Sequence, residues 1–167
     1  MSARGGPAGR AGATLVGVLS DTHGRLPDEV IEAFAGVQAI VHAGDVVDEA
    51  DLLILGTIAP VIAVRGNCDR HGRTSLLPHV VNVAIGGVRF LVGHSLQDLL
   101  TQVDPVTAGA TVVVSGHTHR ARVETRHGVL HVNPGSASGP RGTRRSVALL
   151  TIAPDGEVEA RIVDLGT

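Results

Sequence analysis

The first part of the chain alternates short apolar runs with segments of helical character. Three continuous apolar runs are typical of buried strands: 13–20, 38–44 and 59–66. The segments between them are predicted to be helices. The segment 28–36 starts with acidic residues that follow a proline, and the segment 49–56 ends at a glycine. This strand–helix–strand–helix–strand order predicts three parallel strands joined by right-handed crossovers.

The pattern changes after Pro78, where antiparallel signals replace parallel ones. Two apolar runs flank Gly86 and Gly87, which is the signature of a two-residue hairpin turn. We then expect a helix at 96–103, a strand at 110–116, and antiparallel strands within 120–133, 146–153 and 157–165. The whole pattern predicts an α/β fold in which two mixed β-sheets pack as a sandwich flanked by helices.

Two glycine-rich segments stand outside this pattern. Residues 1–12 contain Gly, Ala and Arg without an apolar period, so we expect a flexible N-terminal tail before a single domain at residues 13–167. The segment 138–146 reads as a basic loop rather than a linker. Its arginines are expected to be solvated, unless the loop folds toward an anionic substrate: Arg141, Arg144 and Arg145.

Composition narrows the functional classes. Hydrophobic residues make up 43% of the 167 positions and aromatic residues only 1%, so the core must consist mainly of Val, Leu, Ile and Ala. A formal net charge of -2 provides no basic field for a nucleic-acid backbone, which argues against dedicated nucleic-acid binding. A single cysteine and the lack of a long apolar span favour a cytoplasmic location without membrane attachment.

Side chains able to bind metals follow almost every predicted strand. They come, in chain order, directly after an apolar run: Asp21 and His23, Asp45, Asn67, His94, and His117 with His119. Asn133 follows a later strand in the same way. Because ligands of α/β sheets gather at the C-terminal strand ends, we expect these groups to converge from distant parts of the chain.

This donor set indicates a particular metal chemistry. Carboxylates, neutral imidazoles and an amide oxygen suit Mn, Fe, Ni, Co, Zn or Mg, with Mn favoured here. Seven ligands are too many for one tetrahedral ion but suit two divalent ions that share a carboxylate. Two such ions, about 3.5–4 Å apart, hold a bridging hydroxide and clamp a phosphoryl group for attack.

Other polar residues have equally plausible structural explanations. His42 precedes Asp45 and is either a support for the ligands or an ordinary buried histidine. Asp69 is expected to orient its neighbours rather than bind metal. For Asn133 and Ser136, bonding to the ligand loops and capping of a turn both remain open. The other histidines are expected in loops or on sheet surfaces: His71, His79, His127 and His131.

The order of the motifs resembles a known enzyme family. The series S-D-T-H (20–23), G-D (44–45), G-N-C-D (66–69), G-H (93–94) and G-H-T-H (116–119), followed by N-P-G-S (133–136), resembles the calcineurin-like metallophosphoesterase superfamily. It is most similar to the small bacterial and archaeal phosphodiesterase branch, which is related to the retromer scaffold subunit. The resemblance extends from about residue 14 to the C-terminus.

The resemblance implies roles for the individual side chains. One metal would be held by Asp21, His23 and His119, the other by Asn67, His94 and His117, with Asp45 bridging both. It also implies a phosphodiesterase or phosphatase acting on a small phosphate ester, and a homo-oligomeric assembly.

Two positions depart from the pattern of this family. Many members have His where Cys68 stands, and that His protonates the leaving oxygen; a thiol is a poorer acid, so Cys68 is either a weak catalytic group or a packing residue. The fourth motif of this branch is often His-Gly-His, whereas here His94 is followed by Ser95. Two functions compete with hydrolysis: a protein-interaction scaffold on the same fold, and metal binding without turnover.

Overall fold

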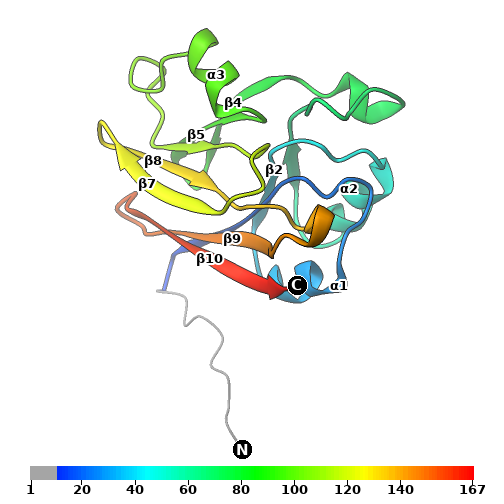
Figure 1. Ribbon diagram of the computed structural model, residues 1–167. Helices are drawn as coiled ribbons and strands as arrows, with labels where there is room; N and C mark the ends of the chain where they lie inside the picture. Colours follow the sequence, from blue (N-terminus) through cyan, green and yellow to red (C-terminus); the bar gives the residue numbers. More distant parts are fainter. Residues whose placement is uncertain (1–10) are drawn as a thin grey trace, which may run out of the picture.

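The computed structural model describes residues 11–167 and contains two five-stranded sheets (Figure 1). The predicted flexible tail at residues 1–12 therefore lies almost wholly outside the described residues. No helix within residues 11–167 has the length and the apolar character that crossing a membrane requires.

The first sheet contains the three predicted parallel strands. These are β1 (Thr14–Leu19), β2 (Ala39–His42) and β3 (Val61–Ala63), connected through α1 (Asp28–Ala33) and α2 (Glu49–Gly56). The C-terminal strands β9 (Arg145–Ile152) and β10 (Val158–Gly166) complete the sheet beside β1 in antiparallel orientation. The strand order is β10-β9-β1-β2-β3.

The second sheet has the order β4-β5-β6-β8-β7. The predicted hairpin at Gly86 and Gly87 is confirmed, because it joins β4 (Val80–Ile85) to β5 (Val88–Gly93). The helix α3 (Leu96–Gln102) leads to β6 (Val112–Val114), which is parallel to β5. Strand β8 (Val129–Asn133) is parallel to β6, and β7 (Arg122–Arg126) forms the edge.

Apolar packing arranges these elements in layers. The faces that the two sheets turn toward each other form the largest apolar cluster, which includes Val16, Val41, Phe90 and Val114. The helices α1 and α2 pack on the outer face of the first sheet, and α3 packs on the outer face of the second (Figure 1). The predicted sandwich with outer helices is therefore confirmed.

The structure corrects several local predictions. Strands β3 and β6 have only three residues each, because the ends of both apolar runs leave the sheet and form loops. Short 3-10 turns at Arg73–Leu76 and Pro140–Gly142 were not predicted. The surface position expected for His131 is wrong: it is buried on β8.

Candidate metal centre

The C-terminal ends of strands from both sheets meet at one place. Asp21 and His23 follow β1, Asp45 follows β2 and Asn67 follows β3, all in the first sheet. From the second sheet, His94 follows β5, and the loop after β6 carries the two remaining histidines, His117 and His119. Because the sheets pack face to face, the structure brings all seven predicted side chains together.

The first group of donor atoms surrounds Oδ1 of Asp21. The Nε2 atoms of His119 and His23 lie 3.2 Å and 3.6 Å from this oxygen. The same two nitrogens lie 3.4 Å from each other. Three potential ligand atoms thus point toward one small volume.

The second group surrounds Oδ1 of Asn67. Nε2 of His94 lies 3.0 Å from this oxygen, and Nδ1 of His117 lies 3.2 Å from it. The carboxylate of Asp45 lies between the two groups, since its Oδ2 is 3.3 Å from Nε2 of His94 and 3.8 Å from Nε2 of His23.

The donor atoms of His94 show why a cation fits this place. Its Nδ1 lies 2.8 Å from the carbonyl oxygen of Ala43, which only accepts hydrogen bonds, so Nδ1 carries the proton. In the neutral ring, Nε2 then has a lone pair that faces the oxygens of Asn67 and Asp45. Three acceptors that face one another without a donor between them are well suited to a divalent cation.

The charges of the two carboxylates favour the same interpretation. Burial opposes ionisation of Asp45, but hydrogen bonds from His94 and from the backbone N–H of Cys68 lower its pKa to about 2. In the absence of a cation a proton takes its place: burial opposes protonation of His94, yet a hydrogen bond from the protonated Nε2 to Asp45 and the charges of Asp21 and Asp45 raise the pKa of His94. The centre is therefore built to hold positive charge.

The backbone around the ligands adopts an unusual conformation. Five of the seven side chains start from residues with positive φ: Asp21 (56°), His23 (50°), Asp45 (54°), His117 (71°) and His119 (58°). For residues other than glycine, this region costs about 1–2 kcal/mol each. Such strain persists where the surrounding structure imposes it, and it is concentrated at functional sites.

Two glycines allow the ligand loops to approach each other. A Cβ atom on Gly66 would overlap Oδ1 and the backbone nitrogen of Asp45. One on Gly116 would overlap the hydroxyl of Ser20 and approach Oδ2 of Asp21. Only glycine fits these two contacts.

Hydrogen bonds behind the ligands hold Asp21 in position. Its Oδ2 accepts from Ser20 Oγ at 2.6 Å and from the backbone N–H of His117 at 3.0 Å, which leaves Oδ1 directed at the centre. Its carbonyl oxygen accepts from Ser136 and Ser138 at 2.8 Å and 3.0 Å. Ser136 thus bonds to a ligand loop, one of the two roles left open by the sequence; Ser20 and Ser138 were missed.

Three further polar residues support the loops. Asn133 donates to the carbonyl of Gly116 at 3.0 Å, and its own Oδ1 accepts from Gly135, so it both holds the ligand loop and forms a turn. The carboxylate of Asp69 accepts the backbone N–H groups of Gly66 and Val47, as expected for an orienting residue. His42 is fully buried, and its Nδ1 accepts from the backbone N–H of Gly44 at 3.2 Å, in the loop that carries Asp45.

Cys68 lies at the edge of the centre. Its Sγ lies within 4.8 Å of ligand atoms of His23 and Asp45. Burial and the neighbouring carboxylate of Asp45 raise the pKa of this thiol, so it stays protonated at neutral pH.

A cleft of about 370 Å³ opens beside the second group of donor atoms. It is lined by Asn67, His94 and His117 of that group and by residues that include Arg65, His79 and Gln102. His79 lies in a loop as expected, but neither it nor Arg65 and Gln102 was connected with this centre from the sequence.

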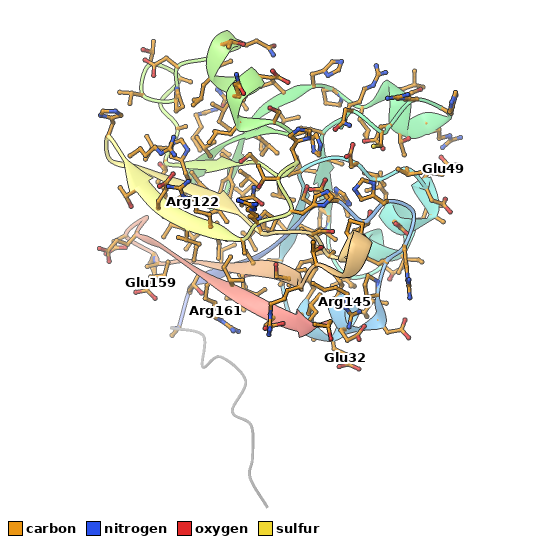
Figure 2. The ribbon with its side chains drawn as sticks, viewed as in Figure 1. Glu32, Glu49, Arg122, Arg145, Glu159 and Arg161 are labelled. Atoms are coloured by element: carbon orange, nitrogen blue, oxygen red, sulfur yellow. The ribbon has the colours of Figure 1, made fainter. Side chains whose placement is uncertain are left out.

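The basic loop does not direct its described arginines at this centre. Arg144 forms an ion pair with Asp164, and Arg145 donates to Glu29 and to the carbonyl of Leu165, both at 2.9 Å (Figure 2). The alternative in which these two arginines reach a substrate at the metals is therefore wrong. The side chain of Arg141 lies outside the described part of the chain.

Comparison of the sequence with known proteins gives consistent matches. The model of the calcineurin-like phosphoesterase superfamily domain matches residues 15–155. A probable metallophosphoesterase of Methanothermobacter thermautotrophicus is 36% identical over 162 residues, covering 91% of this chain and 93% of that protein. Phosphodiesterase YfcE of Escherichia coli K12 is 35% identical over 147 residues, covering 74% of this chain and 79% of that protein.

Solved structures with the same architecture include an enzyme and a sorting protein. An archaeal phosphodiesterase superposes with a TM-score of 0.75 at 25% identity, covering 90% of this chain and 100% of that chain. Vacuolar protein sorting 29 from Cryptosporidium parvum superposes with a TM-score of 0.72 at 22% identity, covering 93% and 99%. The second likeness concerns the fold alone.

Proposed function

The chain belongs to the calcineurin-like phosphoesterase superfamily, and from that premise we propose that it hydrolyses phosphodiesters with two divalent cations. Asp21, His23 and His119 would hold one cation. Asn67, His94 and His117 would hold the other, and Asp45 would be shared. The cations, when bound, supply the positive charge that activates water and stabilises charge on the phosphoryl group.

One observation carries this proposal. When the His94 ring is neutral, the lone pair of its Nε2 faces Oδ1 of Asn67 at 3.0 Å and Oδ2 of Asp45 at 3.3 Å, with no donor between them. His94 and Asp45 are buried, and burying their acceptors against each other is unfavourable unless a cation or a proton satisfies them. Two carboxylates beside two divalent cations leave a net positive centre, which attracts an anionic ester.

The protein residues would orient the ester and its leaving group. The cleft beside the second group offers Arg65, His79 and Gln102 to a polar substituent of the phosphate. Nε of Arg65 donates to the carbonyl of Asp69 at 3.1 Å, and this bond fixes the guanidinium at the wall of the cleft. Cys68 would lie on the side of the departing oxygen.

Metal-dependent hydrolysis of bis(p-nitrophenyl) phosphate tests the proposal. The purified chain, treated with a chelator, should be inactive, and Mn, Fe, Ni, Co, Zn or Mg should each be added back in turn, with Mn expected to serve best. No hydrolysis with any of these metals would overturn the proposal. In that case a protein-interaction scaffold on the same fold would be the better explanation. We favour hydrolysis over the scaffold because all seven proposed metal ligands are intact.

Three further expectations belong to the proposal. We expect a homo-oligomer, which light scattering measures, and a cytoplasmic location, which cell fractionation measures. We also expect residues 13–167 to fold as one domain, so that unfolding of this segment shows a single cooperative transition.

A further inference from the structure

A second cavity lies on the outer face of the second sheet. Its volume is about 600 Å³, within the range of small-molecule sites. Val132 and Leu130 of β8 face the core between the sheets, so the alternate residues His131 and Asn133 face outward into the cavity. The edge strand β7 contributes its outward residues beside them.

The wall formed by β7 carries an excess of positive charge. Arg122 and Arg126 both form ion pairs with Glu124, which lies between them on the same face of the strand. Arg120 lines the cavity as a third guanidinium. One carboxylate against three guanidinium groups leaves this wall cationic; Figure 2 shows Arg122 at this edge of the molecule.

A buried imidazole in the cavity has an unused hydrogen-bonding atom. His131 is 7% exposed, and its Nδ1 has no hydrogen-bond partner among residues 11–167. Burial, followed by the charge of Arg126, lowers the pKa of His131, so the ring is neutral at pH 7. A neutral ring offers one N–H donor to a ligand. The enclosed Nδ1 cannot meet a ligand directly, so the ring reaches one through Nε2.

The cavity adjoins the candidate metal centre through one loop. Gly116 and Thr118 line the cavity, while His117 and His119, in the same loop, face Asn67 and Asp21 of the candidate metal centre. Asn133 ties this loop to β8 by donating to Gly116 and Thr118. A ligand in the cavity therefore touches the segment that holds two of the seven proposed metal ligands.

We propose that this cavity is a binding site for a phosphate group, recognised by Arg122 and Arg126 and by the imidazole of His131. Guanidinium groups bind phosphate oxygens in a two-pronged geometry, and Glu124 holds them in place until an anion competes for them. The phosphate is either a second phosphate of the ester substrate, an assignment that rests on the proposed function, or a free small anion.

Binding of inorganic pyrophosphate to the metal-free protein tests the site without any turnover. Isothermal titration calorimetry in the presence of chelator should show binding to the wild type and about tenfold or weaker binding to R122Q and R126Q. The control R161Q removes an exposed arginine from β10 and should bind as the wild type does (Figure 2). No binding to the wild type, or equal binding to all variants, would overturn the inference.

The variant E124Q separates anion binding from a structural role of the ion pairs. Loss of the competing carboxylate should tighten pyrophosphate binding, whereas damage to β7 would weaken it and overturn the inference. The ring nitrogen signals of His131 in a long-range ¹H–¹⁵N spectrum should shift when pyrophosphate is added, and unchanged signals would remove His131 from the site.

Turnover then distinguishes the two sources of the phosphate. The matched substrates are thymidine 5′-(p-nitrophenyl phosphate) and its 3′-phosphorylated analogue. If the site serves the substrate, R122Q and R126Q lower kcat/KM only for the analogue; a free anion is the ligand if kcat/KM is unchanged for both while pyrophosphate binding is lost. Absence of hydrolysis would contradict the proposed function alone, because pyrophosphate binding is measured without metal.

Discussion

The backbone N–H of Cys68 donates to Oδ1 of Asp45 at 2.8 Å, and the other oxygen of that carboxylate faces His94 and His23. One oxygen of Asp45 is thus committed to the protein, and the second is left between the two groups of ligand atoms. This division explains how a single side chain takes a fixed position between the two groups, where the two proposed cations would lie.

Asp45→Asn should abolish nearly all turnover while leaving the fold intact. The amide oxygen still accepts from Cys68, but the charge that both cations share is lost, which should lower kcat by about 10²-fold or more. The matched control is Asp48→Asn, because Asp48 caps α2 from an exposed position and Asn caps a helix equally well. Activity of Asp45→Asn within a few-fold of wild type would show that Asp45 is not shared.

We expect two divalent cations per chain. Elemental analysis of metal-reconstituted protein should give two equivalents for the wild type. It should give about one for both His119→Gln and His117→Gln, since each removes a ligand from a different group. A single tetrahedral zinc in the wild type would contradict the two-metal arrangement.

Gly66→Ala should destabilise the protein and disturb the metal centre. The added methyl group meets Asp45, and overpacking of this kind costs about 1–3 kcal/mol of unfolding free energy. Gly56→Ala is the control: it lies at the end of α2 with open space around its Cβ, so it should be neutral or slightly stabilising. Urea unfolding of both variants measures the difference, and equal stabilities would contradict the predicted overlap.

His42 should make the stability of the metal-free protein depend on pH. Burial, followed by the charge of His94, lowers the pKa of His42 from 6.5 to about 3. Between pH 3 and pH 6.5 only the unfolded chain binds this proton. The contribution of His42 to the free energy of unfolding is therefore fully present above pH 6.5 and is lost as the pH falls toward 3.

This single group should contribute a loss of about 2 kcal/mol between pH 7 and pH 5. His42→Gln should remove that part of the pH dependence, measured by urea unfolding at both pH values. His71→Gln, at an exposed position, is the control. If the free energy of unfolding changes with pH by the same amount in wild type and in His42→Gln, then His42 takes up a proton in the folded state.

The sequence predicted which side chains converge because parallel strands end at a common edge. Each apolar run is followed by a polar side chain, and the pairing of β1 with β2 and of β5 with β6 brings those ends together. The bounds of α2 were predicted for a local reason as well, since the segment begins after Asp48 and ends at Gly56. Local chemistry and strand direction are both visible in the sequence.

The features that were missed depend on distant neighbours. His131 reads as an outward residue of an edge hairpin, and it does face outward, but it lies in a cavity lined also by β7 and by Leu96 at the start of α3, which leaves it only 7% exposed. Ser138 reaches Asp21 across more than a hundred residues. Such contacts are determined by how the layers stack, and the periodicity of a single segment carries no information about them.

Cys68→His should add acid catalysis for poor leaving groups. An aryl oxide departs without a proton, whereas an alkoxide requires an acid, and the raised pKa of the Cys68 thiol makes it a weak one. An imidazole at this position, close to His23 and Asp45, should raise kcat for an alkyl diester by about 10²-fold at most.

The measurement is kcat/KM for one aryl and one alkyl diester, in wild type and in Cys68→His, with the same metal. The gain should appear for the alkyl ester, because only its leaving oxygen needs the proton, and metal affinity should change little. Cys68→Ser is the matched control, since a hydroxyl is no better an acid than the thiol and should leave both rates near those of wild type. Equal changes for the two substrates in Cys68→His would mean that position 68 does not face the leaving group, and Cys68 would then be a packing residue.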